Sequence, residues 1–195
     1  MTPPPEPPKR QPSGHARPAI QQLATRTVYR NPWMTVREDQ IRRADGSQGV
    51  YGVIDKPDFA LVIPADRDGF WLVEQYRYTV AGRFWEFPQG TFPHGQDGDP
   101  AELARSELEE ETGLRARRLE HLARLHVAYG MSSQGCNVFL ATGLEHGSVR
   151  REQEEQDMRQ QWVTRATFEQ MIHDGAITDI ATIAAYALLR LREAT

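Results

Sequence analysis

A short helix with firm limits at both ends, over residues 99–113, constrains the fold of this chain more than any other segment. Asp99 can cap the free amides of the first turn, Pro100 suits the first helical position, and Glu102 can reach back toward the cap. Gly113 then supplies a left-handed stop. The rest of the fold must therefore be built around one helix of fixed length.

Segments of strand type lie on both sides of this helix. Before it, runs rich in β-branched and aromatic residues are separated by turn residues such as Asp45–Gly46 and Asp66–Gly69. These runs cover residues 34–41, 50–54, 59–65 and 70–78. Later runs cover residues 118–128, 137–142 and 160–163, although periodicity alone also allows a helix over 119–127. The first two runs and their turn predict an N-terminal hairpin.

Two further helices are expected near the end of the chain. The first covers residues 166–174 and is closed by Gly175; the second covers residues 180–191, begins at Thr178 or Asp179, and is apolar on most faces. Strands interspersed with three helices predict an α+β layered domain. A length of 195 residues suits a single domain, and the proline-rich residues 1–19 are expected to form a disordered tail.

Composition narrows the class of protein. The net charge is only -4, with both signs interspersed, which argues against bulk binding of nucleic acid. The longest apolar stretch, Ile180–Leu189, is shorter than the roughly 20 residues of a membrane span, and no charged-then-apolar leader opens the sequence. The single cysteine, Cys136, cannot form an internal disulfide and is expected in the core. These features predict a soluble, cytoplasmic protein.

Three carboxylates share one face of the central helix. Glu107, Glu110 and Glu111 stand at i, i+3 and i+4, within reach of a common point. Like charges at this spacing repel, so a hard divalent cation is a natural partner, since carboxylate oxygens suit Mg²⁺. The alternative is a solvated charged face, the more common fate of such runs.

The order of residues around this helix resembles the Nudix box, G-x5-E-x7-R-E-U-x-E-E-x-G-U, in which U is aliphatic. Glu107 to Leu114 match every fixed position after the arginine of the box. Before it the chain departs from the pattern: two extra residues separate Gly90 from Glu107, Gly98 stands where the family has its first glutamate, and Ser106 replaces the arginine, with Arg105 one place away.

The resemblance implies a Nudix-type α/β/α sandwich, in which helices flank a mixed sheet preceded by the N-terminal hairpin. Residues 20–56 would form the N-terminal strands and residues 57–195 the catalytic domain. It also implies a site for Mg²⁺ or Mn²⁺. The metal ligands would be the backbone carbonyl of Gln89 and the side chains of Glu107, Glu110 and Glu111, while Arg77 and Glu86 would bind the substrate.

The implied reaction is attack of water on one phosphorus of a diphosphate, which yields two monophosphates. In ADP-ribose hydrolases of the family, a loop glutamate takes the proton; Glu152, Glu154 and Glu155 occupy that loop here, and Glu154 is the preferred match. An exposed acidic loop is the alternative. Gly98 and Ser106 also permit a second hypothesis, a non-catalytic nucleotide-binding module that regulates a partner. An isoprenoid diphosphate isomerase ranks last, because it would need a reactive cysteine.

Within the family, residues 72–77 and 85–90 are similar to segments of the ADP-ribose pyrophosphatases and related nucleotide-sugar hydrolases. Tyr129 and Gln134 stand where that group carries proline and glutamate, which leaves other nucleoside diphosphate sugars and dinucleotides open as substrates. Trp33, Trp85 and Tyr129 could stack on a base or fill the core. The group also implies a homodimer, with the N-terminal hairpin reaching across to the other subunit.

Overall fold

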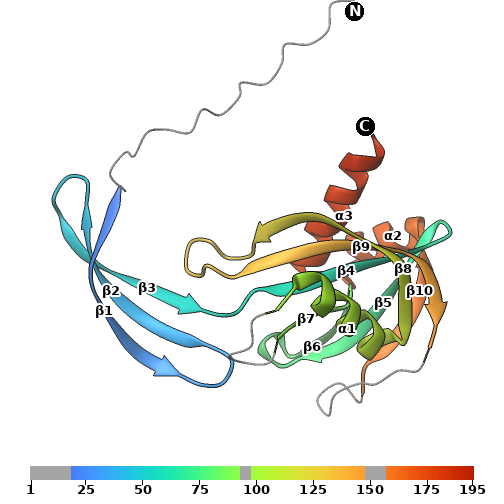
Figure 1. The fold of residues 1–195 in the computed structure, drawn as a ribbon, viewed down its shortest axis with the longest axis horizontal. Helices are drawn as coiled ribbons and strands as arrows, with labels where there is room; N and C mark the ends of the chain where they lie inside the picture. The colour runs from blue at the N-terminus through green and yellow to red at the C-terminus, as the bar shows by residue number, and fades with distance from the viewer. Residues whose placement is uncertain (1–18, 93–97, 148–156) are drawn as a thin grey trace, which may run out of the picture.

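A computed structural model describes residues 19–92, 98–147 and 157–195. Its N-terminal part is a three-stranded antiparallel sheet of β1 (Ile20–Arg30), β2 (Thr35–Arg43) and β3 (Gln48–Asp55), which extends away from the rest of the molecule (Figure 1). Strands β2 and β3 are the predicted hairpin, and Gly46 takes a positive φ of 87° in its turn. The predicted tail lies, apart from Ala19, outside the described residues.

Strand β1 is an addition to the predicted hairpin. All of its residues are exposed, and its register on β2 shifts twice, between Gln22 and Ala24 and between Thr27 and Tyr29. Each shift moves the following side chains to the other face. The strand therefore lacks the alternation by which a half-buried strand is recognised.

The main sheet has seven strands in the order β10-β5-β4-β9-β8, with β6 paired to β5 and β7 paired to β4. It is mixed as predicted, because β4 and β9 run parallel and the other pairs are antiparallel. The strands are β4 (Phe59–Asp66), β5 (Gly69–Arg77), β6 (Gly82–Glu86), β7 (Gln89–Thr91), β8 (Leu114–His126), β9 (Gly135–His146) and β10 (Arg159–Thr164). A short 3-10 turn, Tyr78–Val80, links β5 to β6.

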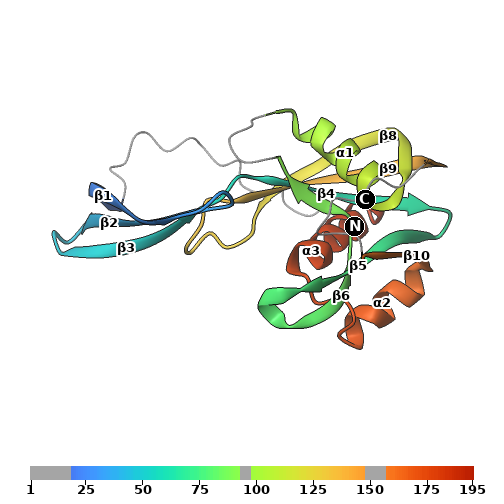
Figure 2. The ribbon, with the colours of Figure 1, turned by 90° about the horizontal axis from the view of Figure 1, so that it is seen from below.

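Helices cover both faces of the main sheet, so the predicted α/β/α sandwich is confirmed (Figure 2). Successive side chains of β4 point to opposite faces. Ala60 and Val62 pack with Leu108 of α1 (Pro100–Thr112). Leu61 and Ile63 pack on the other side in a cluster that includes Phe168 of α2 (Arg165–His173) and Tyr186 of α3 (Ile180–Glu193).

Both predicted ends of α1 and the predicted start of α3 are confirmed. The Asp99 carboxylate accepts from the backbone N–H of Ala101 at 2.9 Å, and Gly113 closes α1 with a φ of 69°. Asp179 caps α3 by accepting from the N–H of Thr182 at 2.8 Å. Within the described ranges, no helix is long and apolar enough to cross a membrane.

The helical alternative for residues 119–127 is wrong. These residues belong largely to β8, which pairs with β9 along most of its length, from Leu114 opposite His146 to His126 opposite Gly135. A register shift between His121 and Ala123 disturbs the two-residue alternation and makes a helical period plausible from sequence alone. Strands β6 and β7 were not predicted either, because they are short and their pairing depends on distant residues.

Candidate active site

The acidic face of α1 meets the backbone of β7. The N–H of Gln89 donates to Oε2 of Glu111 at 3.2 Å, and a Cβ atom at Gly90 would lie only 2.3 Å from Oε1 of Glu107. Both carboxylates are buried, Glu111 with 1 % of its surface exposed. A side chain at position 90 would therefore displace the Glu107 carboxylate from this place.

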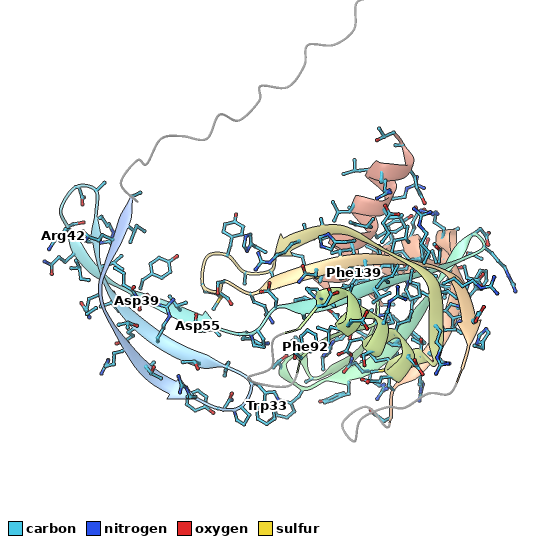
Figure 3. All side chains as sticks on the ribbon, in the orientation of Figure 1. Trp33, Asp39, Arg42, Asp55, Phe92 and Phe139 are labelled. Atoms are coloured by element: carbon cyan, nitrogen blue, oxygen red, sulfur yellow. The ribbon has the colours of Figure 1, made fainter. Side chains whose placement is uncertain are left out.

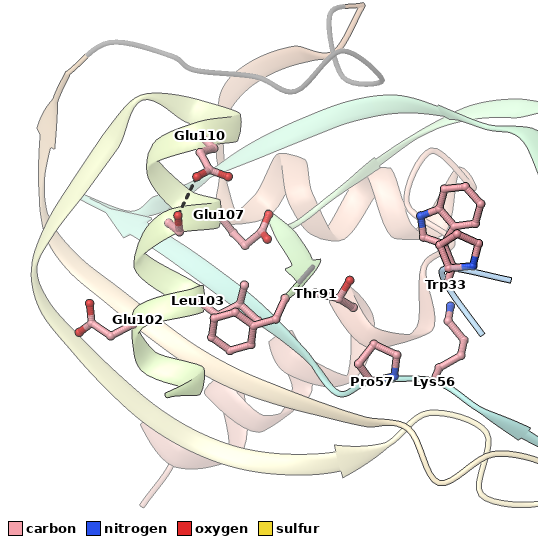
Figure 4. Close-up of a pocket in the computed structure, with 11 residues that line it drawn as sticks. Trp33, Lys56, Pro57, Thr91, Glu102, Leu103, Glu107 and Glu110 are labelled. Atoms are coloured by element: carbon pink, nitrogen blue, oxygen red, sulfur yellow. Dashed lines mark hydrogen bonds between the residues drawn. The ribbon is translucent and has the colours of Figure 1, made fainter. Parts of the chain in front are cut away.

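The third carboxylate of this face, Glu110, is held differently. Its Oε1 accepts from the hydroxyl of Ser106 at 2.7 Å, one turn earlier on α1 (Figure 4). Arg105 precedes Ser106 on α1, and its Nη1 donates to the backbone carbonyl of Ala116 at 3.2 Å. Arg105 therefore does not replace the arginine that the Nudix pattern places at position 106, and the neutral hydroxyl of Ser106 donates to Glu110 instead.

A cavity of about 740 Å³ lies beside this face (Figure 4). One wall comes from α1 and includes Glu107 and Glu110. The opposite wall comes from the N-terminal sheet and its link to β4, with Trp33 and Lys56. Trp33 is 71 % exposed, so its indole does not fill a core.

A second cavity, of about 580 Å³, lies beside the first; Lys56 and Thr91 line both. Arg77 and Glu86 face each other in it as an ion pair, and Nε2 of Gln75 also donates to Glu86 at 2.8 Å. Burial raises the pKa of the Glu86 carboxyl, and the charge and hydrogen bonds of Arg77 only partly oppose this shift.

Asp179 also lines this second cavity, whereas the sequence predicted it only as the start of a helix. Its Oδ2 accepts from Nε2 of Gln89 at 3.3 Å as well as capping α3. Gln134 also lines the cavity. Tyr129 lies outside both cavities with 85 % of its surface exposed, whereas Trp85 packs partly buried against the core.

The donor set on α1 and β7 fits a hard divalent cation. Two buried carboxylates, Glu107 and Glu111, face the backbone next to the carbonyl of Gln89, which would supply oxygen ligands alone. Among the described residues, no group of three or more histidine, cysteine, aspartate or glutamate side chains is arranged to hold a metal ion. Mg²⁺ does not require such a group, because it keeps several waters and binds through one or two carboxylates together with substrate phosphates.

Glu154, with its neighbours Glu152 and Glu155, lies outside the described residues, so the assignment of the proton acceptor stays a prediction. Cys136 is buried in the core, and burial raises the pKa of its thiol to about 12. The prediction of a core cysteine is confirmed, and the isomerase hypothesis loses its reactive group.

Comparison with known proteins agrees with this architecture. Residues 20–54 match the nucleoside diphosphate sugar hydrolase N-terminal domain, and residues 56–185 match the NUDIX domain. The ADP-ribose pyrophosphatase of Mycobacterium tuberculosis is 32 % identical over 165 residues, covering 83 % of this chain and 79 % of the relative. The methanol dehydrogenase activator of Bacillus methanolicus is 26 % identical, covering 88 % of this chain and 93 % of the relative.

A solved structure described as an ADP compounds hydrolase shares the fold, with a TM-score of 0.79 at 23 % identity over 91 % of this chain and 95 % of that one. The NUDIX match spans the main sheet, the acidic face of α1 and the lining of both cavities apart from Pro32 and Trp33. The chain therefore belongs to the Nudix family, as a pyrophosphohydrolase that resembles the ADP-ribose pyrophosphatases.

Proposed function

We propose that this protein hydrolyses the diphosphate bond of a nucleoside diphosphate linked to another group, of the ADP-ribose or nucleotide-sugar type, in a metal-dependent reaction. The products are a nucleoside monophosphate and a second phosphate compound. The observation that carries this proposal is the burial of Glu107 and Glu111 against the Gln89–Gly90 backbone. Two carboxylates buried close together on one helix face repel each other and lose hydration, and a bound divalent cation would offset that cost.

The proposed metal ligands are the side chains of Glu107 and Glu111 and the carbonyl of Gln89, with Glu110 in direct or water-mediated contact. Mg²⁺ or Mn²⁺ bound there would neutralise charge on the phosphate oxygens and orient the attacking water. Ser106 fixes Glu110 through its 2.7 Å hydrogen bond. Because the donor is a neutral hydroxyl where the family pattern has an arginine, the acidic face keeps more negative charge for the cation to balance.

Arg77 is proposed to bind a phosphate oxygen of the substrate. Its Nε and Nη2 both donate to Glu86, so the guanidinium is oriented while Nη1 stays available to a ligand. Glu86 therefore orients Arg77 and also lines the second cavity itself. Glu154 is the proposed acceptor for the proton of the attacking water. The variant Glu154→Gln tests this role: loss of turnover with unchanged substrate affinity would support it, and an unchanged rate would rule it out.

A substrate panel with and without metal tests the proposed function. Turnover of ADP-ribose, ADP-glucose, GDP-mannose, NADH and dinucleoside polyphosphates is followed by phosphate release with a coupled phosphatase, in Mg²⁺ and in chelator. We expect metal-dependent turnover of at least one compound. Tight nucleotide binding without turnover would instead favour the non-catalytic module, to which the replacement of the box arginine by Ser106 points.

We also propose a homodimer formed through the three-stranded sheet. Large apolar side chains are exposed on this sheet, and apolar surface of this kind marks sites of protein–protein interaction. They are Ile20, Leu23, Val28, Tyr29, Val50 and Tyr51. Light scattering should therefore give twice the mass of 22.2 kDa; the mass of a single chain would overturn the proposal.

A further inference from the structure

Lys56 stands at the junction of the two cavities. It follows β3 and precedes β4, and its side chain is exposed. It lines the cavity beside α1 (Figure 4) and also the cavity beside Arg77. Thr91 is the other residue common to the two linings. A ligand that occupies both cavities must therefore pass beside the Lys56 ammonium group.

The charges around Lys56 are mostly negative. Glu102, Glu107 and Glu110 line the first cavity, and Glu86 and Asp179 line the second. Among the described lining residues, the cations are Lys56 and Arg77. Arg77 already pairs with Glu86. Lys56 makes no ion pair with any residue that the structure describes, so its charge is available to a ligand.

The backbone on which Lys56 stands is fixed by its neighbours. The carbonyl of Pro57 accepts from Nε2 of Gln134 at 2.8 Å. The carboxylate of Asp58 accepts from Nε of Arg124 at 2.7 Å and from the N–H of Gly135 at 2.6 Å. The backbone at Lys56 is therefore held in place, while its ammonium group makes no ion pair with a described residue. The fixed backbone lowers the entropy that is lost when a ligand binds.

We propose that Lys56 is a substrate-binding residue, which donates to a non-bridging oxygen of the diphosphate while the two groups joined by that diphosphate occupy the two cavities. An ammonium group suits this place because it is a compact point charge that can contact either phosphate. The inference rests on the proposed function. It adds a specificity determinant, since a monophosphate would fill one cavity only and would bind more weakly.

Kinetics with matched variants tests the role. Lys56→Met should raise KM about ten- to a hundredfold, the loss expected for one hydrogen bond to a charged group, with a smaller change in kcat. Lys56→Arg should restore most of the affinity. The control is Arg42→Met, which removes an exposed cation from β2 at the far end of the N-terminal sheet, away from both cavities, and should leave KM unchanged (Figure 3). An unaltered KM in Lys56→Met would overturn the inference.

A second measurement does not depend on turnover. The chain has only two lysines, Lys9 and Lys56, so reductive methylation with ¹³C-formaldehyde gives a simple NMR spectrum, in which Lys56→Arg identifies the Lys56 signal. With Mg²⁺ present, α,β-methylene-ADP should move the Lys56 signal strongly and AMP weakly. Ligand-induced amide shifts without a response of Lys56 would overturn the inference and leave the proposed function standing. Absence of any amide shift, together with silence across the substrate panel, would overturn both.

Discussion

The two sheets of this protein differ in what they bury. The main sheet packs apolar side chains on both faces, and fourteen buried residues form the larger of its two clusters. In the three-stranded sheet, Ile41 and Asp39 are the buried residues, and most of its large apolar side chains are exposed. A sheet with its own core can hold charged groups such as Glu111 in fixed positions, whereas a sheet without one depends on backbone pairing and on a partner.

The largest effect is expected in the main body, from Glu111→Gln. Turnover should fall on the order of 10²–10³-fold, because the amide can still accept from the N–H of Gln89 but no longer carries the charge that a cation requires. The urea midpoint should stay close to that of the unchanged protein. Glu109→Gln is the control, since Glu109 lies on the same helix but pairs with Arg115 at the surface and lines neither cavity. An unchanged rate in Glu111→Gln would remove this residue from the metal site.

A charge introduced on the N-terminal sheet should weaken association of the proposed dimer rather than destabilise the fold. Leu23→Asp places a charge in its exposed apolar surface, and we expect the dissociation constant of the dimer to rise at least about a hundredfold, since a buried unpaired charge is costly. Light scattering across a dilution series measures this. The unfolding midpoint of the main body should barely move, and Gln48→Asp at an exposed polar position serves as control. A dimer that tolerates Leu23→Asp would place its interface elsewhere.

Two glycine-to-alanine variants, one in each region, test the same difference between the two sheets. In Gly90→Ala the new methyl group collides with the Glu107 carboxylate, which must shift, so we expect a loss of roughly tenfold in turnover and about 1–3 kcal/mol in stability. In Gly52→Ala, on β3, the added methyl group meets nothing within 4 Å, and both quantities should stay unchanged. Steady-state kinetics and urea unfolding measure the two effects. Equal behaviour of the two variants would contradict the close approach of β7 to α1.

The parts of the fold that could be predicted are those with local signals. The ends of α1 follow from Asp99 and Gly113, whose roles depend on a few neighbouring residues. Strand β7 has only three residues, and it exists because Gln89 and Gly90 pair with Leu61 and Ala60 of β4. Such pairing is a tertiary effect, and a three-residue segment is too short to show the two-residue alternation that predicts a strand.

The same distinction holds for the candidate site. Helical spacing predicts that Glu107 and Glu111 share a face, and the family pattern points to Gln89. Lys56 was not predicted, because its place between the two cavities depends on how the link between the sheets passes the acidic helix. A signal was present in the composition, since lysine occurs only twice in a chain with 23 basic residues.

The smallest effects compare one ion pair from each region. Asp58, at the start of β4, binds Arg124 through both carboxylate oxygens and also accepts from the N–H of Gly135, whereas Glu38 pairs with Arg26 on the surface of the N-terminal sheet. Asp58→Ala should cost about 1–3 kcal/mol in the free energy of unfolding. Glu38→Ala should cost less than about 1 kcal/mol, because the Arg26 side chain that it pairs with is 73 % exposed, against 41 % for Arg124.

The pH dependence of the Asp58 effect separates the ion pair from simple packing. Burial alone raises the pKa of Asp58, but its hydrogen bonds to Arg124 and Gly135 outweigh burial and hold the pKa below its ordinary value of 3.8. A carboxyl with a lowered pKa in the folded state stabilises the protein above its unfolded pKa, and this stabilisation is lost as the pH falls through the folded value. The difference in unfolding free energy between the unchanged protein and Asp58→Ala should therefore be full at neutral pH and shrink below pH 3.8. A difference that stays constant down to the acid transition would mean that Asp58 acts through packing rather than through its charge.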